Sequence, residues 1–174
     1  MADSREGEIG WYNPDPRAII PLDTFHITRS LQLTIKKKPF DLKINTEFEQ
    51  VMRYCAERED TWISEQIVKS YLFLHHLGFA HSVECWKDDS LVGGLYGVAL
   101  GGAFFGESMF SLMRDASKIA LVYLVERLRS RDFVLLDTQF ITPHLARFGT
   151  YEVPRDEYLK RLKKAIKKPC KFTD

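Results

Sequence analysis

The sequence contains little cysteine and no long uninterrupted apolar run. Its three cysteines, Cys55, Cys85 and Cys170, form no C-x-x-C pair, which argues against a disulfide framework or a zinc knuckle and favours a reducing compartment. The first ten residues lack the basic and apolar regions of a secretory signal. The most apolar stretch, residues 91–106, is interrupted by glycines and is shorter than the roughly 18 residues that suggest a membrane span. We therefore expect a cytoplasmic protein with no membrane partner.

An excess of charge of one sign is also missing. The 174 residues include 25 Lys and Arg against 24 Asp and Glu, which excludes a polycation and an acidic tail. The charge is uneven, however: residues 155–174 carry +5, so the total of +1 leaves −4 for the rest. The length suits one hydrophobic core. We expect a single domain over residues 1–174, with a flexible end at 1–10 and a basic C-terminal helix and tail at 155–174.

Apolar periodicity and cap residues predict the helices and strands. Thr46 and Glu49 match a T-x-x-E capping box that predicts a helix to about Arg58, and Ser64 with Gly78 predicts the start and end of a second helix. The other predicted elements are strands at 42–45, 81–86, 91–100, 103–108 and 133–140, and helices at 112–129, 143–149 and from 154 onward. This order resembles that of the GCN5-related N-acetyltransferase fold. We therefore expect an α/β protein with a mixed α+β sheet and helices on both faces.

Several motifs of other chemistries are incomplete in this chain. An acetyltransferase of that fold would bind the coenzyme A pyrophosphate at a glycine-rich turn, but the equivalent stretch, residues 108–120, contains no glycine. Residues 106–110 match a G-x-S-x-G nucleophile elbow except at the last glycine. His75, His76 and His81 have no carboxylate at metal-ligand spacing. We expect neither coenzyme A, nor a metal, nor any other cofactor.

Two carboxylates stand out because they interrupt apolar strands. Glu107 lies near the end of one predicted strand and Asp137 lies within another, where an unpaired carboxylate is costly to bury. Such a group is either paired structurally or kept for function, and spacing alone favours neither interpretation. Gln139 follows Asp137 by two residues, so both side chains are expected on one face of the strand.

Six segments together resemble one family, the leucyl/phenylalanyl-tRNA-protein transferases. They are WYNPDPRAIIPL (11–22), TWI (61–63), HSVECW (81–86), LVGGLYGVALGGAFFGESMFS (91–111), ASKIAL (116–121) and LLDTQF (135–140). The resemblance implies a GCN5-like domain that takes leucine or phenylalanine from its tRNA and links it to an N-terminal Arg or Lys of an acceptor protein, which marks that protein for degradation by the N-degron pathway. Acceptors beginning with Asp or Glu remain an alternative.

The resemblance also implies roles for individual residues. Asp137 and Gln139 match the family's catalytic acid and amide, and Glu107 matches a carboxylate that helps to place the acceptor and the aminoacyl ester. Four apolar positions match a pocket for leucine, phenylalanine or methionine side chains: Leu95, Phe104, Met109 and Leu121. Trp62 matches an aromatic that stacks on the terminal adenosine of the tRNA. From the pattern alone, these five residues would be assigned to the core.

The partners follow from the same resemblance. Lysines at 36–38 and the basic helix with Lys160, Arg161, Lys163, Lys164, Lys167 and Lys168 are candidates for contact with tRNA phosphates, and the alternative is a solvated helix face packed through Leu159, Leu162 and Ile166. The family's usual N-terminal segment has no counterpart before Trp11. We expect a monomer. Two rivals are an acyltransferase with another acyl donor and a non-catalytic tRNA or N-degron binder.

Overall fold

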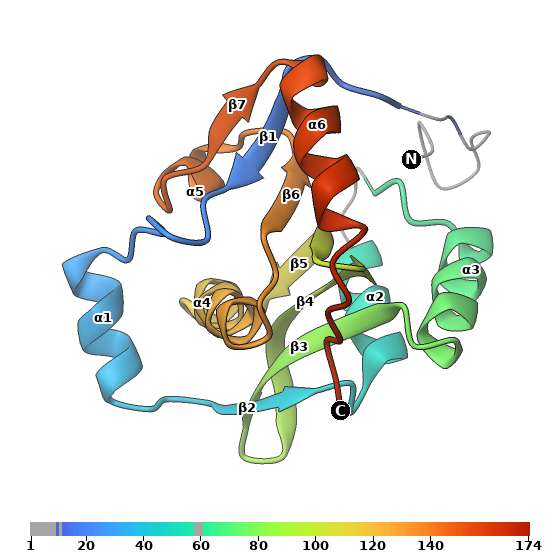
Figure 1. The fold of residues 1–174 in the computed structure, drawn as a ribbon. Coiled ribbons are helices and arrows are strands. Elements are labelled where there is room, and N and C mark those ends of the chain that lie inside the picture. Colours follow the sequence, from blue (N-terminus) through green and yellow to red (C-terminus); the bar gives the residue numbers. More distant parts are fainter. Residues whose placement is uncertain (1–9, 11, 58–60) are drawn as a thin grey trace.

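The computed structural model describes residues 10, 12–57 and 61–174, and within these ranges one mixed sheet organises the fold (Figure 1). Its seven strands lie in the order β2-β3-β4-β5-β6-β1-β7. Their bounds are β1 Arg17–Ile20, β2 Asp41–Ile44, β3 Ala80–Lys87, β4 Ser90–Leu100, β5 Ala103–Ser111, β6 Leu135–Gln139 and β7 Tyr151–Val153. The pair β5 and β6 is parallel and the other pairs are antiparallel. The prediction of an α/β protein with a mixed sheet is confirmed.

Helices cover both faces of the sheet (Figure 1). They are α1 Arg29–Lys36, α2 Phe48–Ala56, α3 Glu65–His76, α4 Ala116–Ser130, α5 Pro143–Ala146 and α6 Arg155–Ala165. One apolar cluster joins the buried side of α4 to Leu95, Phe104 and Leu136 of the sheet, while α2 and α3 pack in a second cluster with Tyr96 and Phe110. A third cluster packs α6 on β1, β6 and β7. None of the described helices is long and apolar enough to cross a membrane.

The glycines of β4 let α4 approach the sheet closely. A Cβ atom at Gly93 would lie only 2.4 Å from the Cβ of Ala116, the first residue of α4. The start of this helix is also tied to β3, because the Cys85 thiol donates a hydrogen bond to the Ala116 carbonyl at 3.2 Å. The long helix is thus held directly against the centre of the sheet, under the residues that form the candidate site.

Most of the predicted elements are present, with shifted ends. Ser64 caps α3 and Thr142 caps α5 through their side chains, and Gly78 adopts the expected left-handed conformation. The helix expected at 112–129 begins later, at Ala116, and the strand expected to end at Ser108 continues to Ser111. Three elements, β1, α1 and β7, were not predicted. The expected flexible end at 1–10 and the expected helix end at Arg58 fall mainly outside the described residues.

The predicted capping box at Thr46 and Glu49 is wrong. The N-cap residue of α2 is Glu47, which makes no side-chain cap, and Glu49 instead pairs with Arg53 one helical turn later. The free backbone N–H groups of Thr46 and Glu47 both donate to Oε1 of Glu84 at 2.9 Å. Glu84 is fully buried on β3. A carboxylate from a distant strand therefore accepts from the Thr46 N–H, which the Glu49 side chain was expected to satisfy, and from the Glu47 N–H as well.

Candidate active site

The sheet opens between its two parallel strands. β5 and β6 pair at Ala103–Leu135, Phe104–Leu136 and Phe105–Asp137, and in the described register the pairing stops there. A cavity of about 510 Å³ occupies the space beyond this point. Its walls come from β4, β5, β6, α4, α5 and the segments beside them: Trp62, Leu95, Tyr96, Gly106, Glu107, Ser108, Met109, Phe110, Ser111, Ser117, Leu121, Leu124, Leu136, Thr138, Gln139, Phe140, Thr142, His144 and Leu145. Since Leu121 belongs to the α4 side and Trp62 to the α2 and α3 side, the cavity joins both faces of the sheet.

A β-bulge places Glu107 at this opening. Tyr96 of β4 pairs with Ser108, and the next residue, Gly97, pairs with Gly106, so Glu107 is the extra residue on β5. Bulges re-aim a side chain relative to the regular alternation of a strand. The Glu107 carboxyl lies close enough to the Tyr71 hydroxyl of α3 and to the Gln139 amide for hydrogen bonding to both to affect its pKa. Its pKa is raised above the ordinary value by burial, a rise that the Asp137 charge adds to and that these two hydrogen bonds oppose.

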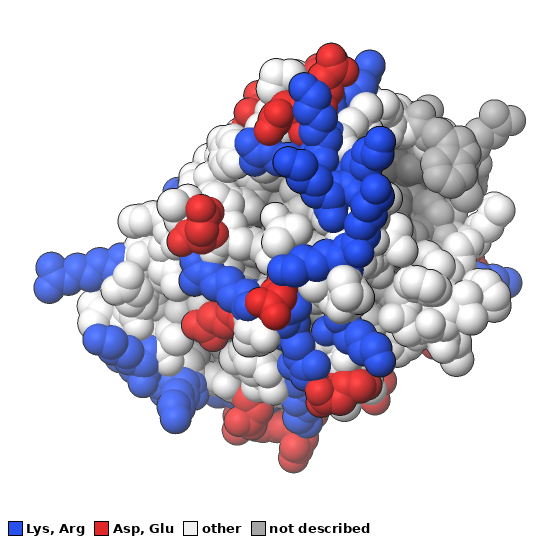
Figure 2. All heavy atoms as spheres, viewed as in Figure 1, with Lys and Arg blue, Asp and Glu red and all other residues white. Residues whose placement is uncertain are grey.

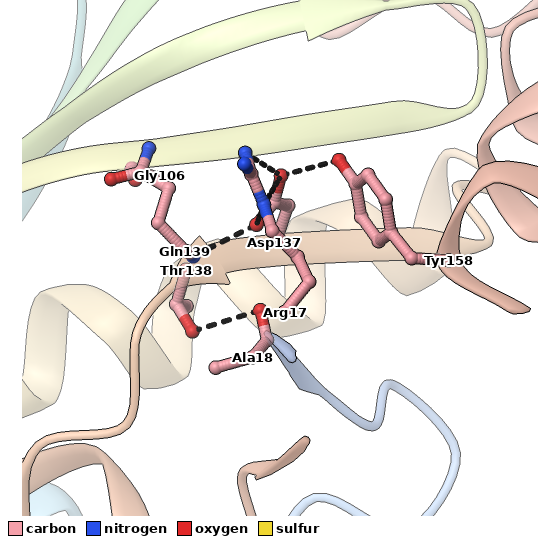
Figure 3. A network of polar contacts seen from close by, with 7 residues as sticks. All are labelled: Arg17, Ala18, Gly106, Asp137, Thr138, Gln139 and Tyr158. Atoms are coloured by element: carbon pink, nitrogen blue, oxygen red, sulfur yellow. Dashed lines mark hydrogen bonds and ion pairs between the residues drawn. The ribbon is translucent and has the colours of Figure 1, made fainter. Parts of the chain in front are cut away.

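Asp137 has a different environment, because its carboxylate is fully buried and does not line the cavity. The Arg17 guanidinium approaches both carboxylate oxygens, with Nε 3.0 Å from Oδ1 and Nη2 2.7 Å from Oδ2 (Figure 3). The Tyr158 hydroxyl donates to Oδ2 at 2.5 Å and the Gln139 backbone N–H donates to Oδ1 at 2.8 Å. The carboxylate is therefore held by charge-assisted hydrogen bonds from three residues on three elements.

Gln139 connects this buried network to the cavity. A second bulge, between β6 and β1, pairs Ala18 with Gln139 and Ile19 with Asp137, so that Thr138 is the extra residue. Gln139 itself has φ = 65°, in the left-handed region that residues other than glycine seldom adopt. Its side chain reaches Gly106 (Figure 3), and its amide donates to the Gly106 carbonyl at 3.2 Å, one residue before Glu107. Asp137 and Gln139 thus do not lie side by side on one face: the Asp137 carboxylate is buried, and the Gln139 side chain faces the cavity.

The pocket residues expected from the sequence are brought together with one exception. Leu95, Met109, Leu121 and Trp62 line the cavity. Phe104 does not; it is fully buried under α4, with its ring centroid 5.2 Å from that of Phe172. The sheet explains this, because Phe104 is still within the paired part of β5, where the strands are closed.

Other residues of the site were not found from the sequence. The cavity is also lined by Leu136, Phe140, Thr142 and His144, and Asp137 is held by Arg17 and Tyr158, which lie near opposite ends of the chain. Arg17 and Tyr158 carried only a weak signal: Arg17 lies within the WYNPDPRAIIPL segment. The Arg17 contact with Asp137 depends on the pairing of β1 with β6, and the Tyr158 contact depends on the packing of α6 on the sheet; no local pattern shows either of them.

The histidines have structural surroundings. The His75 ring stacks on Phe48 with centroids 4.2 Å apart, and its Nδ1 bonds to the Ala80 carbonyl. His81 is buried beside Asn45 and Phe172, and desolvation lowers its pKa to about 4. Within the described ranges, no group of three or more His, Cys, Asp or Glu side chains is placed to hold a metal ion.

Comparison with known proteins gives the family. The family model described as leucyl/phenylalanyl-tRNA protein transferase matches residues 19–163. Curated proteins named leucyl/phenylalanyl-tRNA-protein transferase are 58% identical over 168 residues in Herpetosiphon aurantiacus, 54% over 172 in Gloeobacter violaceus and 58% over 170 in Akkermansia muciniphila. These alignments cover 96%, 99% and 95% of this chain and 88%, 89% and 88% of the relatives. The chain therefore belongs to the leucyl/phenylalanyl-tRNA-protein transferase family.

One solved structure also aligns with the fold. It is described as the structure of L-PGS from Bacillus licheniformis, and it matches with a TM-score of 0.48 at 16% identity, covering 76% of this chain and 50% of that one. A likeness of this size does not define the function of either protein.

Proposed function

We propose that this chain transfers leucine, phenylalanine or methionine from its tRNA to the N-terminal amine of proteins that begin with Arg or Lys, as a step of the N-degron pathway. Family membership makes the chain an aminoacyltransferase. The observation that carries the proposal is the apolar cavity with a carboxyl group and an amide, Glu107 and Gln139, at the opening between β5 and β6. The fold class that we propose is the GCN5-related N-acetyltransferase type, on the basis of element order and of the opening in the sheet.

The apolar wall favours an apolar aminoacyl side chain. Leu95, Met109, Leu121, Leu124 and Leu136 face the cavity from the α4 side of the sheet. A hydrocarbon or thioether side chain gains free energy when it leaves water for such a surface, whereas a polar one loses hydrogen bonds to water that this wall does not replace. Trp62 lies on the other side, where its ring is available for stacking on the terminal adenosine.

The chemistry needs an amine aligned with an ester that is already activated. The α-amine nitrogen attacks the ester carbonyl carbon, a carbon–nitrogen bond forms, the carbon–oxygen bond to the tRNA ribose breaks, and one amine proton ends on the ribose hydroxyl. We assign the proton transfer to Glu107, since its raised pKa makes the ionised carboxylate a stronger base than an exposed glutamate. Gln139 orients the amine by hydrogen bonding, and orientation itself can contribute much of the rate.

Asp137 works through Gln139 in this proposal. Its carboxylate accepts from Arg17, Tyr158 and the Gln139 backbone, and it has no exposed surface on which a substrate could bind. The family resemblance led us to expect that Asp137 accepts the proton beside Gln139. We assign this role to Glu107 instead, because Glu107 lines the cavity. Glu107 is also the only carboxyl group among the described cavity residues, so it is the group that suits an acceptor with a basic first residue.

The tRNA contact that we propose is the basic face of α6 and the segment after it. Figure 2 shows Lys and Arg side chains in a continuous run over this part of the surface. Arg161 contacts Glu157 and Tyr151, and Lys168 donates to the Asp132 carbonyl. The residues that we propose for the tRNA contact are the exposed lysines Lys160, Lys163, Lys164, Lys167 and Lys171. The helix packs inward through Tyr158, Leu162 and Ala165, whereas the expected packing residues Leu159 and Ile166 are exposed. The Lys36–Lys38 cluster lies at the end of α1, apart from this face (Figure 1).

Charge reversal tests this contact. Replacing Lys160, Lys164 and Lys167 together by Glu is expected to weaken Leu-tRNA binding and to lower the slope of log affinity against log salt by about one unit per lysine. Turnover at saturating tRNA should change little, because these lysines do not line the cavity. Binding is measured by filter retention over a salt series. The same reversal at Lys36–Lys38 compares the two clusters, and an unchanged slope in the α6 variant would remove α6 from the tRNA interface.

The transferase activity is tested directly by mass spectrometry. The protein is mixed with Leu-, Phe- or Met-tRNA and with peptides that begin with Arg, Lys, Asp or Glu, and the mass added at the N-terminus is read. We expect addition of the apolar amino acid to the Arg and Lys peptides, and little addition from a tRNA charged with glutamine. Transfer from acetyl-coenzyme A instead would support the rival acyltransferase, and binding without any transfer would support a non-catalytic protein.

A further inference from the structure

Two residues that do not line the cavity converge on Asp137 from the two ends of the described chain. Arg17 begins β1 and Tyr158 lies in the first turns of α6, and both side chains point at the same carboxylate (Figure 3). They also contact each other, since the Arg17 guanidinium carbon lies 5.0 Å from the centroid of the Tyr158 ring. The phenol is buried, and the Arg17 side chain is 14% exposed.

These contacts occupy both oxygens of the carboxylate. Oδ1 accepts from Arg17 Nε at 3.0 Å and from the Gln139 N–H at 2.8 Å, while Oδ2 accepts from Arg17 Nη2 at 2.7 Å and from the Tyr158 hydroxyl at 2.5 Å. A fork-to-fork arginine pair fixes the plane of a carboxylate, and the phenol fixes it from a third direction. Because the carboxylate cannot rotate, the position of its bond to the Gln139 backbone is fixed as well.

We propose that Arg17 and Tyr158 are positioning residues for the transfer reaction: through Asp137 they hold Gln139 in its left-handed conformation, with its amide at Gly106 and beside Glu107. The inference rests on the proposed function. A left-handed glutamine is unfavourable by itself and persists only where the surroundings impose it. The bond from its N–H to a clamped carboxylate is the contact that imposes it here.

Neither residue is expected to contact the substrates. Arg17 and Tyr158 are absent from the cavity wall, whereas Gln139 and Glu107 belong to it. We call the contacts of Arg17 and Tyr158 with Asp137 the Asp137 clamp. Weakening this clamp should reduce the fraction of molecules in which the Gln139 amide is correctly placed. It should therefore lower kcat and leave the KM values for aminoacyl-tRNA and peptide unchanged. A purely structural role would instead lower the amount of folded protein.

Tyr158→Phe tests the proposal with the smallest change. It removes the hydroxyl on Asp137 and keeps the ring under Arg17, and we expect kcat to fall about tenfold, as is typical for a lost hydrogen bond to a charged group, with both KM values within about twofold of the parent. Tyr151→Phe is the matched control. It also removes one phenol that is bonded to a charged side chain, Arg161 at 2.7 Å, on the same C-terminal part of the chain, and we expect full activity.

The outcomes separate the inference from the proposed function. If the parent protein transfers no amino acid, the proposed function fails before any variant is compared. If the parent is active and Tyr158→Phe equals it, or loses activity only in proportion to its folded fraction in a thermal melt, the positioning role is overturned. Should Tyr158→Phe not fold, Arg17→Lys decides: it keeps the charge and loses the fork, and the same selective fall in kcat is expected.

Discussion

Glu107→Gln is expected to abolish most of the transfer activity and yet to unfold at a higher temperature than the parent. Loss of a general base lowers kcat by about 10² to 10⁴. The pKa of Glu107 is raised by burial, so the folded state binds its proton more tightly than the unfolded state does. Stability from this group is therefore greatest at low pH and is lost as pH rises through the folded pKa. A neutral amide of the same shape avoids that loss.

Single-turnover transfer and thermal melts at about pH 4 and about pH 8 measure both effects. The difference in melting temperature between variant and parent should be larger at the higher pH and should shrink at the lower one, where Glu107 is itself neutral. Glu49→Gln is the control, because Glu49 is an exposed carboxylate on α2 paired with Arg53. A Glu107→Gln protein with parental kcat would exclude Glu107 as the base.

Asp137→Asn is expected to have the largest effect on stability and a large effect on turnover. The substitution keeps the shape but removes the charge that compensates Arg17, whose side chain is 14% exposed. An ion left without its partner in such a place costs about 3 to 5 kcal/mol in the free energy of unfolding. Turnover should fall far more than tRNA affinity, because Asp137 holds Gln139 and does not line the cavity.

Urea unfolding, filter binding of Leu-tRNA and single-turnover transfer test the three parts of this prediction. Glu157→Gln is the matched control, since it breaks a solvent-exposed pair with Arg161, and pairs of this kind contribute little to the free energy of unfolding. Adding Arg17→Met to Asp137→Asn should restore part of the stability but none of the activity, because the uncompensated charge is gone and the clamp is still absent. Parental turnover in Asp137→Asn would remove Asp137 from the mechanism.

The sequence identified two carboxylates of the site, because each of them interrupts an apolar strand. Glu107 and Asp137 stand out because a carboxylate in an apolar strand is costly to bury, and spacing left a structural pair and a working site equally open. In the structure, the two carboxylates have different surroundings. Asp137 is the structurally paired carboxylate, with Arg17 and Tyr158, whereas Glu107 faces the cavity.

In the fold, features that depend on neighbouring residues were predicted correctly, and features that depend on distant residues were not. The predictions of Ser64 and Thr142 as helix caps are confirmed, because the side chain of a cap residue accepts from a backbone N–H only a few residues later in the chain. The capping box at Thr46 failed because Glu84, 38 positions away in sequence, supplies the acceptor. β1 and β7 have few residues: β7 pairs with β1, and β1 pairs in turn with β6, so the sequence around them carries no periodic signal.

By itself, the sequence determined the family, the mixed α/β class and some of the residues around the cavity, because these depend on local pattern and on the identity of residues in order. Only the tertiary structure decided what each residue faces. The two bulges that re-aim Glu107 and Gln139, the end of β5 and β6 pairing at Phe105 and Asp137, and the clamp on Asp137 all depend on strand register. Register is fixed by long-range pairing and burial together, and a shift of one residue would turn each of these side chains to the opposite face.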